Sequence, residues 1–241
     1  MQRALLGMLT PSSNTVLEPI TADMLGAVEE ASAHFGRFAV TRIALSEGAL
    51  AQFATPEVVK AAELLGHARC QVIGWSGTSS SWLGFESDIR LCQNIESTTG
   101  AKACTSVLAM NEILQKTGAR KLGLVSPYLQ SVQDAIIQNY QTAGYEMVAE
   151  RHLELEDNYS FSEITEAQLE AMIREVAKAK PDAVLIMCTN LRGAPLVDRL
   201  EKELGIPIYD SVSTVVWKAL KLAGIDTRRV TSWGSLFRDV A

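Results

Sequence analysis

The chain has 241 residues, 47% of them hydrophobic, and its formal net charge is -6. This length allows one large or two small domains around an apolar core. The negative charge and the lack of a Lys/Arg cluster argue against a nucleic-acid partner, because phosphate binding needs clustered positive side chains. No apolar run reaches the roughly 20 residues that cross a membrane, so we expect no membrane partner.

Four cysteines and three histidines are spread along the chain. The cysteines form no C-x-x-C pair, which is typical of reduced thiols in a cytoplasmic protein and not of a disulfide framework. The N-terminal residues 1–14 are too short an apolar segment for a signal peptide. No residues have metal-ligand spacing, and neither a P-loop nor a GxGxxG motif occurs. The sequence therefore predicts neither a metal nor a cofactor.

Apolar runs of strand length alternate with amphipathic stretches of helix length along most of the chain. The predicted strands are 3–9, 38–45, 71–75, 101–104, 121–125, 146–153, 183–187 and 206–209. The predicted helices are 57–69, 85–99, 106–118, 130–143, 163–179, 194–204 and 211–224. This alternation predicts an α/β fold with mostly parallel sheets. Ligands bind beyond the carboxyl ends of such strands, so the loops after strands are the candidate site.

Two pairs of similar loops indicate an internal repeat. "LLGMLTPSSN" and "KLGLVSPYLQ" share an apolar strand, a hydroxyl-Pro pair and a polar helix start, with Pro11 and Pro127 116 residues apart (127 − 11). "VIGWSGTSSSWLG" and "LIMCTNLRG" both lead from a strand into hydroxyl residues, with Gly77 and Cys188 111 residues apart (188 − 77). The similar offsets predict two related halves.

We expect each half to be a mostly parallel sheet flanked by helices, with the active site in the cleft between the two pseudo-symmetric halves. The first half would comprise residues 1–114 plus 212–241 and offer the Pro11 and Gly77 loops. The second half would comprise residues 115–211 and offer the Tyr128 and Cys188 loops. The helix-rich end, 211–224, is expected to pack back on the first half.

The four loops carry small hydrogen-bonding groups and few charges. Their polar segments are Pro11-Ser12-Ser13-Asn14, Thr78-Ser79-Ser80, Ser126-Pro127-Tyr128 and Cys188-Thr189-Asn190. Neutral donors, together with the N–H groups of helix starts, suit a carboxylate or an enolate-like carbanion. Each Ser, Thr or Asn could equally cap a helix, and this alternative stays open at every position.

Cys188 allows two interpretations. A lone buried cysteine is usually a small hydrophobic residue, but a strand end before a helix start favours a reactive thiol with a lowered pKa. The repeat selects Cys188 and not Cys104, and we expect Cys70 and Cys92 to be packing residues. The aromatic residues that flank Gly77 are expected to be either pocket walls or core residues; they are Trp75, Trp82 and Phe85.

Five segments, in this order, resemble the aspartate/glutamate racemase superfamily: "MLTPSSNTVLEP", "GTSSS", "SPY", "EDNY" and "CTNLRG". The nearest branches are maleate cis–trans isomerase and arylmalonate decarboxylase, and the resemblance covers essentially the whole chain. It implies two pseudo-symmetric α/β halves with a cofactor-independent active site between them, and a homo-oligomer. Racemases and isomerases of the superfamily use two facing cysteines. This chain has Gly77 at the first position and Cys188 at the second.

A glycine facing a cysteine resembles the arylmalonate decarboxylase branch. The resemblance implies that Cys188 is the catalytic proton donor, and that Pro11 and Pro127 position the loops. The carboxylate- and enediolate-binding residues that it implies are Asn14, Gly77, Thr78, Ser79, Tyr128, Asn158, Thr189 and Asn190. Among these, Asn14 and Asn158 match the isomerase branch better, in which asparagines hold substrate carboxylates.

The leading hypothesis is a cofactor-independent decarboxylase of a small malonate-type dicarboxylic acid, aryl-substituted malonates included. Loss of CO2 needs no base, and a single acid then gives a single stereochemical outcome. One alternative is a maleate isomerase-like or racemase-like enzyme that uses Cys188 with a non-cysteine partner, such as Tyr128 or a bound water. A second alternative is a degenerate family member that binds a small carboxylate without turnover.

Overall fold

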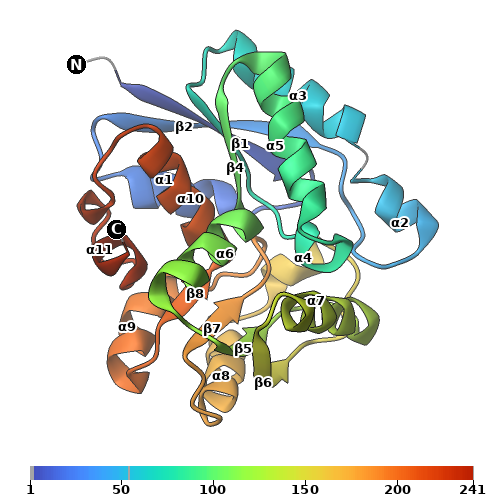
Figure 1. Cartoon of the computed structure of the whole chain (residues 1–241), viewed down its shortest axis with the longest axis vertical. Helices are drawn as coiled ribbons and strands as arrows, with labels where there is room; N and C mark the ends of the chain where they lie inside the picture. The colour runs from blue at the N-terminus through green and yellow to red at the C-terminus, as the bar shows by residue number, and fades with distance from the viewer. Residues whose placement is uncertain (1–2, 54, 241) are drawn as a thin grey trace.

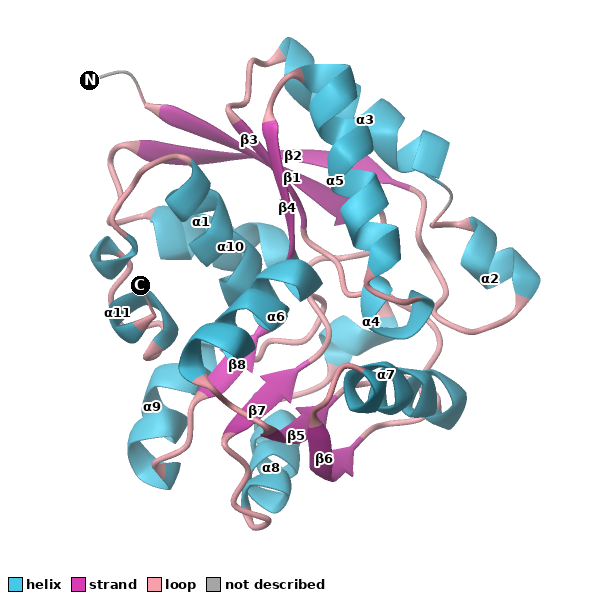
Figure 2. Cartoon of the chain, in the orientation of Figure 1, coloured by secondary structure: helices cyan, strands magenta, loops and turns pink. Residues whose placement is uncertain are grey.

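The computed structural model describes residues 3–53 and 55–240, and their strands form two four-stranded parallel sheets (Figures 1 and 2). The first sheet has the order β2-β1-β3-β4, with β1 Ala4–Pro11, β2 Ala31–Phe38, β3 Val72–Trp75 and β4 Lys102–Thr105. The second has the order β6-β5-β7-β8, with β5 Lys121–Val125, β6 Glu146–Arg151, β7 Ala183–Ile186 and β8 Ile208–Asp210. The predicted α/β class with two parallel sheets is confirmed.

Helices cover both faces of the sheets. In the first part of the chain they are α1 Leu17–Leu25, α2 Glu47–Ala51, α3 Thr55–His67, α4 Ser80–Leu83, α5 Glu86–Thr99 and α6 Ser106–Thr117. In the second part they are α7 Gln130–Thr142, α8 Glu166–Ala177, α9 Ala194–Leu204, α10 Ser211–Leu222 and α11 Leu236–Asp239, with 3-10 turns at Ser160–Glu163 and Thr227–Arg229. Within the described ranges, no helix is long and apolar enough to span a membrane.

The central strands are apolar along their whole length because helices bury both of their faces. In β3 and β7 every residue is buried. On the first sheet, α3 and α5 lie against one face and α1 and α10 against the other. The helix α10 follows the second sheet in sequence but packs on α6, β3 and β4 of the first sheet (Figure 1).

The predicted strand at 38–45 is wrong. The strand lies earlier, at Ala31–Phe38, and pairs with β1 from Ala4↔Ala31 to Pro11↔Phe38. Residues 39–53, which we call the cover segment, instead reach the second half of the chain. There the backbone N–H of Ile43 donates to the Glu156 carbonyl at 2.8 Å, and the N–H of Asn158 donates to Thr41 at 2.8 Å. The cover segment has buried apolar residues because it covers the site, and hydropathy alone does not separate this case from a strand.

The sequence patterns also missed the short helices α1, α2, α4 and α11, which lie next to Pro- or Gly-containing loops. The predicted helix 163–179 is shorter than expected. It begins at Glu166, because the Thr165 side chain accepts from Gln168 N–H and the Gln168 side chain accepts from Thr165 N–H. This reciprocal capping sets the helix start.

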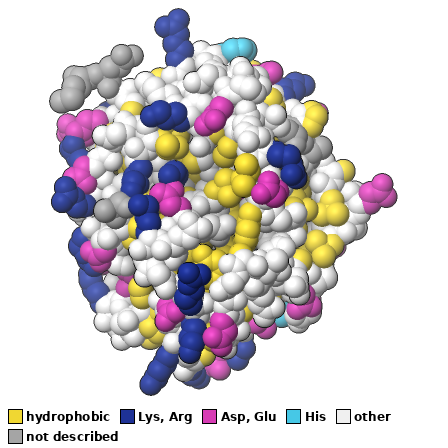
Figure 3. All heavy atoms as spheres, in the orientation of Figure 1, with side chains coloured by type: hydrophobic (Ala, Val, Ile, Leu, Met, Phe, Trp, Pro, Cys, Tyr) yellow, Lys and Arg dark blue, Asp and Glu magenta, His cyan; other side chains and the backbone are white. Residues whose placement is uncertain are grey.

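On the face shown in Figure 3, positive and negative side chains are interspersed. Charged side chains of the described residues form exposed ion pairs, such as Arg42–Glu156 at 2.9 Å and Lys202–Asp198 at 2.6 Å. Exposed pairs of this kind contribute little to stability, because water screens them and ordering two long side chains costs entropy. The fold therefore depends on its apolar core.

Replacing Trp217 tests how far α10 stabilises the fold. Trp217 is fully buried, and its indole N–H donates to the Val240 carbonyl at 3.1 Å. We expect Trp217→Ala to lower the free energy of unfolding by about 3–5 kcal/mol, because it leaves a large cavity. Urea unfolding followed by circular dichroism measures the change. The control Leu64→Ala, at a side chain that is 64% exposed, should stay within about 0.5 kcal/mol of the parent. Equal effects of the two changes would contradict this role of α10.

Candidate active site

A small cavity lies where the loops after β1, β3, β5 and β7 meet, at the carboxyl ends of the strands. Its lining residues are Pro11, Val40, Ile43, Phe53, Trp75, Gly77, Thr78, Ser79, Trp82, Tyr128, Asn158, Cys188 and Thr189. The cavity has a volume of about 20 Å³, which is room for about one water molecule. The chain thus brings both halves to one enclosed site.

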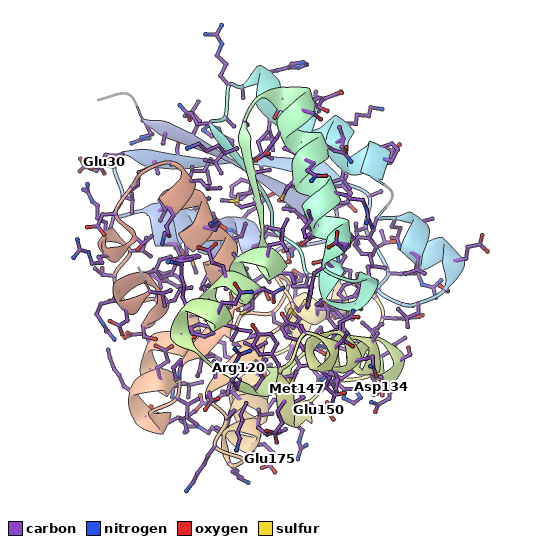
Figure 4. All side chains as sticks on the ribbon, viewed as in Figure 1. Glu30, Arg120, Asp134, Met147, Glu150 and Glu175 are labelled. Atoms are coloured by element: carbon purple, nitrogen blue, oxygen red, sulfur yellow. The ribbon has the colours of Figure 1, made fainter. Side chains whose placement is uncertain are left out.

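Most of the site residues expected from the sequence lie at this cavity. They are Pro11, Gly77, Thr78, Ser79, Tyr128, Asn158, Cys188 and Thr189. The structure places Asn14, Pro127 and Asn190 behind the lining. None of the lining residues carries a charged side chain, whereas charged side chains such as Glu30 and Glu175 lie at the periphery (Figure 4). Any substrate charge would therefore meet neutral hydrogen-bond donors.

Cys188 is 3% exposed, and burial has the largest influence on the pKa of its thiol. Burial raises the pKa of Cys188 to about 12, although the backbone N–H of Asn190 and the hydroxyl of Tyr128 donate to the sulfur and lower it. The charge of Asp210 raises this pKa further. The expectation that a helix start would lower the pKa is wrong, because α9 begins six residues later, at Ala194, and desolvation dominates. At neutral pH the side chain is a thiol.

Tyr128 connects the two halves at the cavity. Its hydroxyl shares a 2.7 Å hydrogen bond with Thr78 Oγ1 of the first half and lies within hydrogen-bonding reach of Cys188 in the second. Its ring packs edge-on against Trp82 and Phe161, with centroid distances of 5.2 Å and 5.6 Å. Burial raises the pKa of Tyr128 well above its ordinary value, so the hydroxyl stays neutral and can donate.

The loop after β3 presents free backbone donors to the cavity. Among the described residues, no hydrogen bond has the backbone N–H of Gly77, Thr78 or Ser79 as its donor. Buried N–H groups are nearly always paired in folded proteins, so three adjacent free donors indicate a place for a ligand. All three residues line the cavity, so their donors suit a carboxylate or an oxyanion that binds there.

Two of the predicted asparagines join loops and do not line the cavity. The Asn14 carboxamide accepts from Val16 and Leu17 N–H at 2.9 Å and 3.0 Å and donates to Thr189 Oγ1 at 3.1 Å. The Asn190 carboxamide accepts from the N–H of Thr15 at 3.1 Å and donates to a backbone carbonyl of the second half at 2.5 Å. Both side chains therefore hold the first and second halves together beside Cys188.

Asn158 lies at the cavity, and its amide also has protein partners. It donates to Ser13 Oγ at 3.0 Å and to the Val40 carbonyl at 3.3 Å.

Of the two predicted prolines, Pro11 lines the cavity and Pro127 does not. The carbonyl of Pro127 accepts from the Leu155 N–H at 3.0 Å. Their predicted role in loop positioning agrees with these places but stays a prediction.

One side of the cavity is apolar. The cover segment contributes Val40, Ile43 and Phe53, and the Gly77 loop and its strand contribute Trp75 and Trp82. Phe85, expected beside them, is not among the lining residues and packs against Tyr140 with a centroid distance of 5.3 Å. The sequence patterns missed the cover segment's contribution, because Val40 and Ile43 were assigned to a strand.

Asp210 is a further buried group near the site that the sequence patterns missed. Its Oδ1 accepts from Val212 and Ser213 N–H at 2.8 Å and 3.3 Å, which caps α10. Its Oδ2 has no hydrogen-bond partner among the described residues. Burial raises the pKa of this carboxyl to about 7. The helix-capping pattern Asp-Ser-Val-Ser could have identified it as a cap, but not as a neighbour of Cys188.

The described residues contain no group of three or more His, Cys, Asp or Glu side chains placed to hold a metal ion. The polar groups at the cavity are hydroxyls, amides and one thiol, and none of the lining residues is histidine or carboxylate. The donor set suits an organic anion, since transition metals prefer imidazole, thiolate or carboxylate ligands.

Comparisons with known proteins agree with this fold. A family model described as arylmalonate decarboxylase matches residues 15–237. The chain is 25% identical to a maleate isomerase of Geobacillus stearothermophilus over 244 residues, 96% of each protein. It is 24% identical to an arylmalonate decarboxylase of Bordetella bronchiseptica over 183 residues, 75% of this chain and 76% of the relative. Among solved structures, a maleate cis–trans isomerase mutant from Nocardia farcinica with a covalently bound succinylcysteine intermediate has a TM-score of 0.90, at 22% identity over 99% of both chains.

The protonation state of Cys188 can be tested directly. We expect the ultraviolet absorbance of thiolate to be the same in the wild type and in Cys188→Ala from about pH 6 to about pH 9, because the buried thiol keeps its proton there. Since the pKa is raised in the folded state, the thiol also stabilises the fold below the ordinary value of 9.0, and that stabilisation is lost as the pH rises toward about 12. A titration step below about pH 8 that is missing in Cys188→Ala would contradict this.

Proposed function

The chain belongs to the arylmalonate decarboxylase family, as its loop motifs indicated, and from that premise we propose that it is a cofactor-independent decarboxylase of a small malonate-type dicarboxylic acid, aryl-substituted malonates included. Relatives in the comparisons are named either maleate isomerase or arylmalonate decarboxylase, so membership alone leaves the reaction open. The observation that carries the choice is that Cys188 is the one cysteine among the lining residues, with Gly77 at the pseudo-equivalent place.

The retained carboxylate would bind at the free donors of the Gly77 loop. The backbone N–H groups of Gly77, Thr78 and Ser79 would donate to it together with the Tyr128 hydroxyl, which bonds Thr78 Oγ1. The Thr189 hydroxyl donates to the Ser76 carbonyl and would turn from it to join them. The backbone N–H groups are fixed before the reaction, so they stabilise the negative charge of an enediolate without reorganisation. The malonate is larger than one water molecule, so the cavity must widen for it to enter.

The departing carboxylate would lie against the apolar wall formed by Trp75, Trp82 and the cover segment. The side chains there are mostly carbon, so the carboxylate would lose solvation that its neutral product, CO2, does not need. The indole N–H of Trp82, which has no partner among the described residues, is the side-chain donor that this wall offers. The Gly77 loop offers more free donors than the wall does, and this difference supports decarboxylation, because an acid that keeps both carboxylates would need comparable donors on both sides.

In the chemical step, the bond between the α-carbon and the departing carboxylate breaks. Its electron pair passes to the α-carbon and delocalises into the retained carboxylate as an enediolate, while CO2 leaves. The Cys188 thiol then gives its proton to the α-carbon, and the thiolate takes a proton from water. The hydroxide left behind combines with CO2, so the net reaction converts the malonate and one water into a monocarboxylate and bicarbonate. The raised pKa of Cys188 suits this role because it keeps the acid protonated.

The second candidate is an isomerase of a small dicarboxylate. The Geobacillus relative named maleate isomerase matches 96% of the chain, against 75% for the Bordetella decarboxylase, which favours this candidate. Here Cys188 would attack the double bond, and Tyr128, which lies within reach of its sulfur, would deliver the proton. Burial raises the pKa of the Cys188 thiol to about 12, which makes it a poor nucleophile at neutral pH and supports the decarboxylase.

Proton NMR in D2O distinguishes the candidates. We expect the wild type to release CO2 from substituted malonates and to place one deuterium on a single face of the α-carbon. Cys188→Ala should lower this rate by at least about 100-fold, because the variant lacks the thiol that acts as the acid. Cys92→Ala, at a thiol outside the cavity, is the matched control and should keep the parent rate.

The same panel contains maleate and chiral amino-acid derivatives. Conversion of maleate to fumarate without loss of CO2 from any malonate would exclude the decarboxylase and support the isomerase. Loss of chirality in an amino-acid derivative would instead indicate a racemase. Turnover of none of the compounds, with a rise in melting temperature on adding a carboxylate, would indicate a binding protein.

Tyr128→Phe tests the hydroxyl between the two halves. We expect kcat for the best malonate to fall about 100-fold with a smaller change in KM, because the donor stabilises charge that develops during the reaction. Tyr140→Phe is the control, since Tyr140 is equally buried and its hydroxyl has no partner among the described residues. A kcat that falls by less than about threefold in Tyr128→Phe would show that this hydroxyl has no part in the reaction.

A further inference from the structure

We propose that Trp75 is the specificity-determining residue of this site. Its indole fills the space that a side chain at position 77 would occupy, so the substrate face turned toward the Gly77 loop meets an aromatic ring and no acid. This inference rests on the proposed function, because it concerns which face of the enediolate receives a proton. It names the physical reason why the site works with one thiol.

The steric evidence comes from Gly77. A β-carbon at this position would lie 2.1 Å from Cζ2 of Trp75 and 2.4 Å from both Cε2 and Cη2. Carbon atoms that are not bonded pack at about 3.5–4.0 Å, so even an alanine would not fit while the indole stays in place. Gly77 does not have a positive φ. Its backbone would therefore tolerate a side chain, and the indole is what excludes one.

The indole is held firmly in its place. Trp75 ends β3, in register with Leu9 of β1 and Thr105 of β4, and is 2% exposed. Its ring packs against Phe38 with a centroid distance of 5.1 Å. Its N–H donates to Ser79 Oγ at 3.4 Å. The ring cannot move away without breaking these contacts, and its N–H already has a partner.

The indole and the thiol lie at the carboxyl ends of corresponding strands, β3 and β7, and both line the cavity. Trp75 precedes the loop after β3 and Cys188 lies in the loop after β7, and both line the same small space. Thr189 Oγ1 donates to the Ser76 carbonyl at 3.3 Å, which joins the two loops directly. An enediolate held between them would have the Cys188 acid on one side and a carbon ring on the other, so protonation from one face follows.

A melting-temperature cycle tests the steric claim without any substrate. Overpacking of a core costs enough that Gly77→Ala and Gly77→Cys should each lower the Tm by about 4–12 °C in the wild type. In a Trp75→Val background, the same changes should lower the Tm by less than about 2 °C, because the blocking ring is gone. Trp75→Leu repeats the cycle in case the valine variant does not fold.

Trp82→Val is the matched control for this cycle. Trp82 is the other tryptophan of the cavity, but none of its atoms is among those nearest to the β-carbon at Gly77. In the Trp82→Val background, Gly77→Cys should therefore lower the Tm as much as it does in the wild type. Equal Tm losses in the wild-type and Trp75→Val backgrounds, or no loss in the wild type, would overturn the proposal.

A second measurement tests the stereochemical claim. A single-handed 2-substituted monocarboxylate, the product of the proposed reaction, is incubated in D2O with each variant. The wild type, Gly77→Cys and Trp75→Val should each leave its chirality intact, whereas the double variant Trp75→Val/Gly77→Cys should exchange the α-hydrogen and racemise it at least about 10-fold faster. Racemisation by Gly77→Cys alone, or no racemisation by a folded double variant, would overturn the specificity role.

The two measurements separate this proposal from the proposed function. If the wild type turns over no malonate, the decarboxylase fails, and the melting-temperature cycle still decides whether Trp75 excludes a side chain at position 77. If the wild type decarboxylates malonates but the Tm changes at positions 75 and 77 are independent, the proposed function is supported and the proposed role of Trp75 is wrong.

Discussion

The hydrogen bond from Asn14 to Thr189, 3.1 Å long, joins the loop after β1 to the loop after β7. With the bonds from Thr15 to Asn190 and from Thr189 to Ser76, it fixes how the two sheets face each other. The bonds from Asn14 to Thr189 and from Thr189 to Ser76 are buried, so breaking either would leave polar groups without partners, at a cost of about 1–3 kcal/mol each. The cavity and the position of Cys188 in it depend on this junction.

Burial at the junction then decides the chemistry of the ionisable groups. Desolvation raises the pKa of Cys188 to about 12 and that of Asp210 to about 7, although backbone N–H groups donate to both. Among the described residues, no cationic side chain contributes to the pKa of Cys188, so nothing of that kind would compensate a buried thiolate and the thiol form is favoured. Burial therefore keeps the Cys188 side chain protonated at neutral pH, and the same burial leaves large apolar side chains beside the donors.

The cover segment links this environment to the rest of the molecule. The Gln52 side chain accepts from the N–H of Thr41 at 2.6 Å and donates to the carbonyl of Arg42 at 3.0 Å, so the segment holds its own shape. Its polar contacts with the second half are two backbone hydrogen bonds, the bond from the Asn158 side chain to the Val40 carbonyl, and the exposed Arg42–Glu156 pair. Val40 and Ile43 are also buried at the cavity, so opening the segment would expose apolar surface as well as break these bonds.

The sequence by itself determined the α/β class and the parallel sheets, because strand and helix periodicity are local properties of the chain, and the resemblance of its loop motifs to a known family indicated most of the residues at the cavity. It placed Gly77, Tyr128 and Cys188 on loops that do meet. Only the tertiary structure decided that 39–53 is a covering segment and not a strand, that burial outweighs a helix start at Cys188, and that the Trp75 ring lies where a side chain at Gly77 would be. These outcomes depend on distances and solvent exclusion between segments far apart in the chain, which no local pattern encodes.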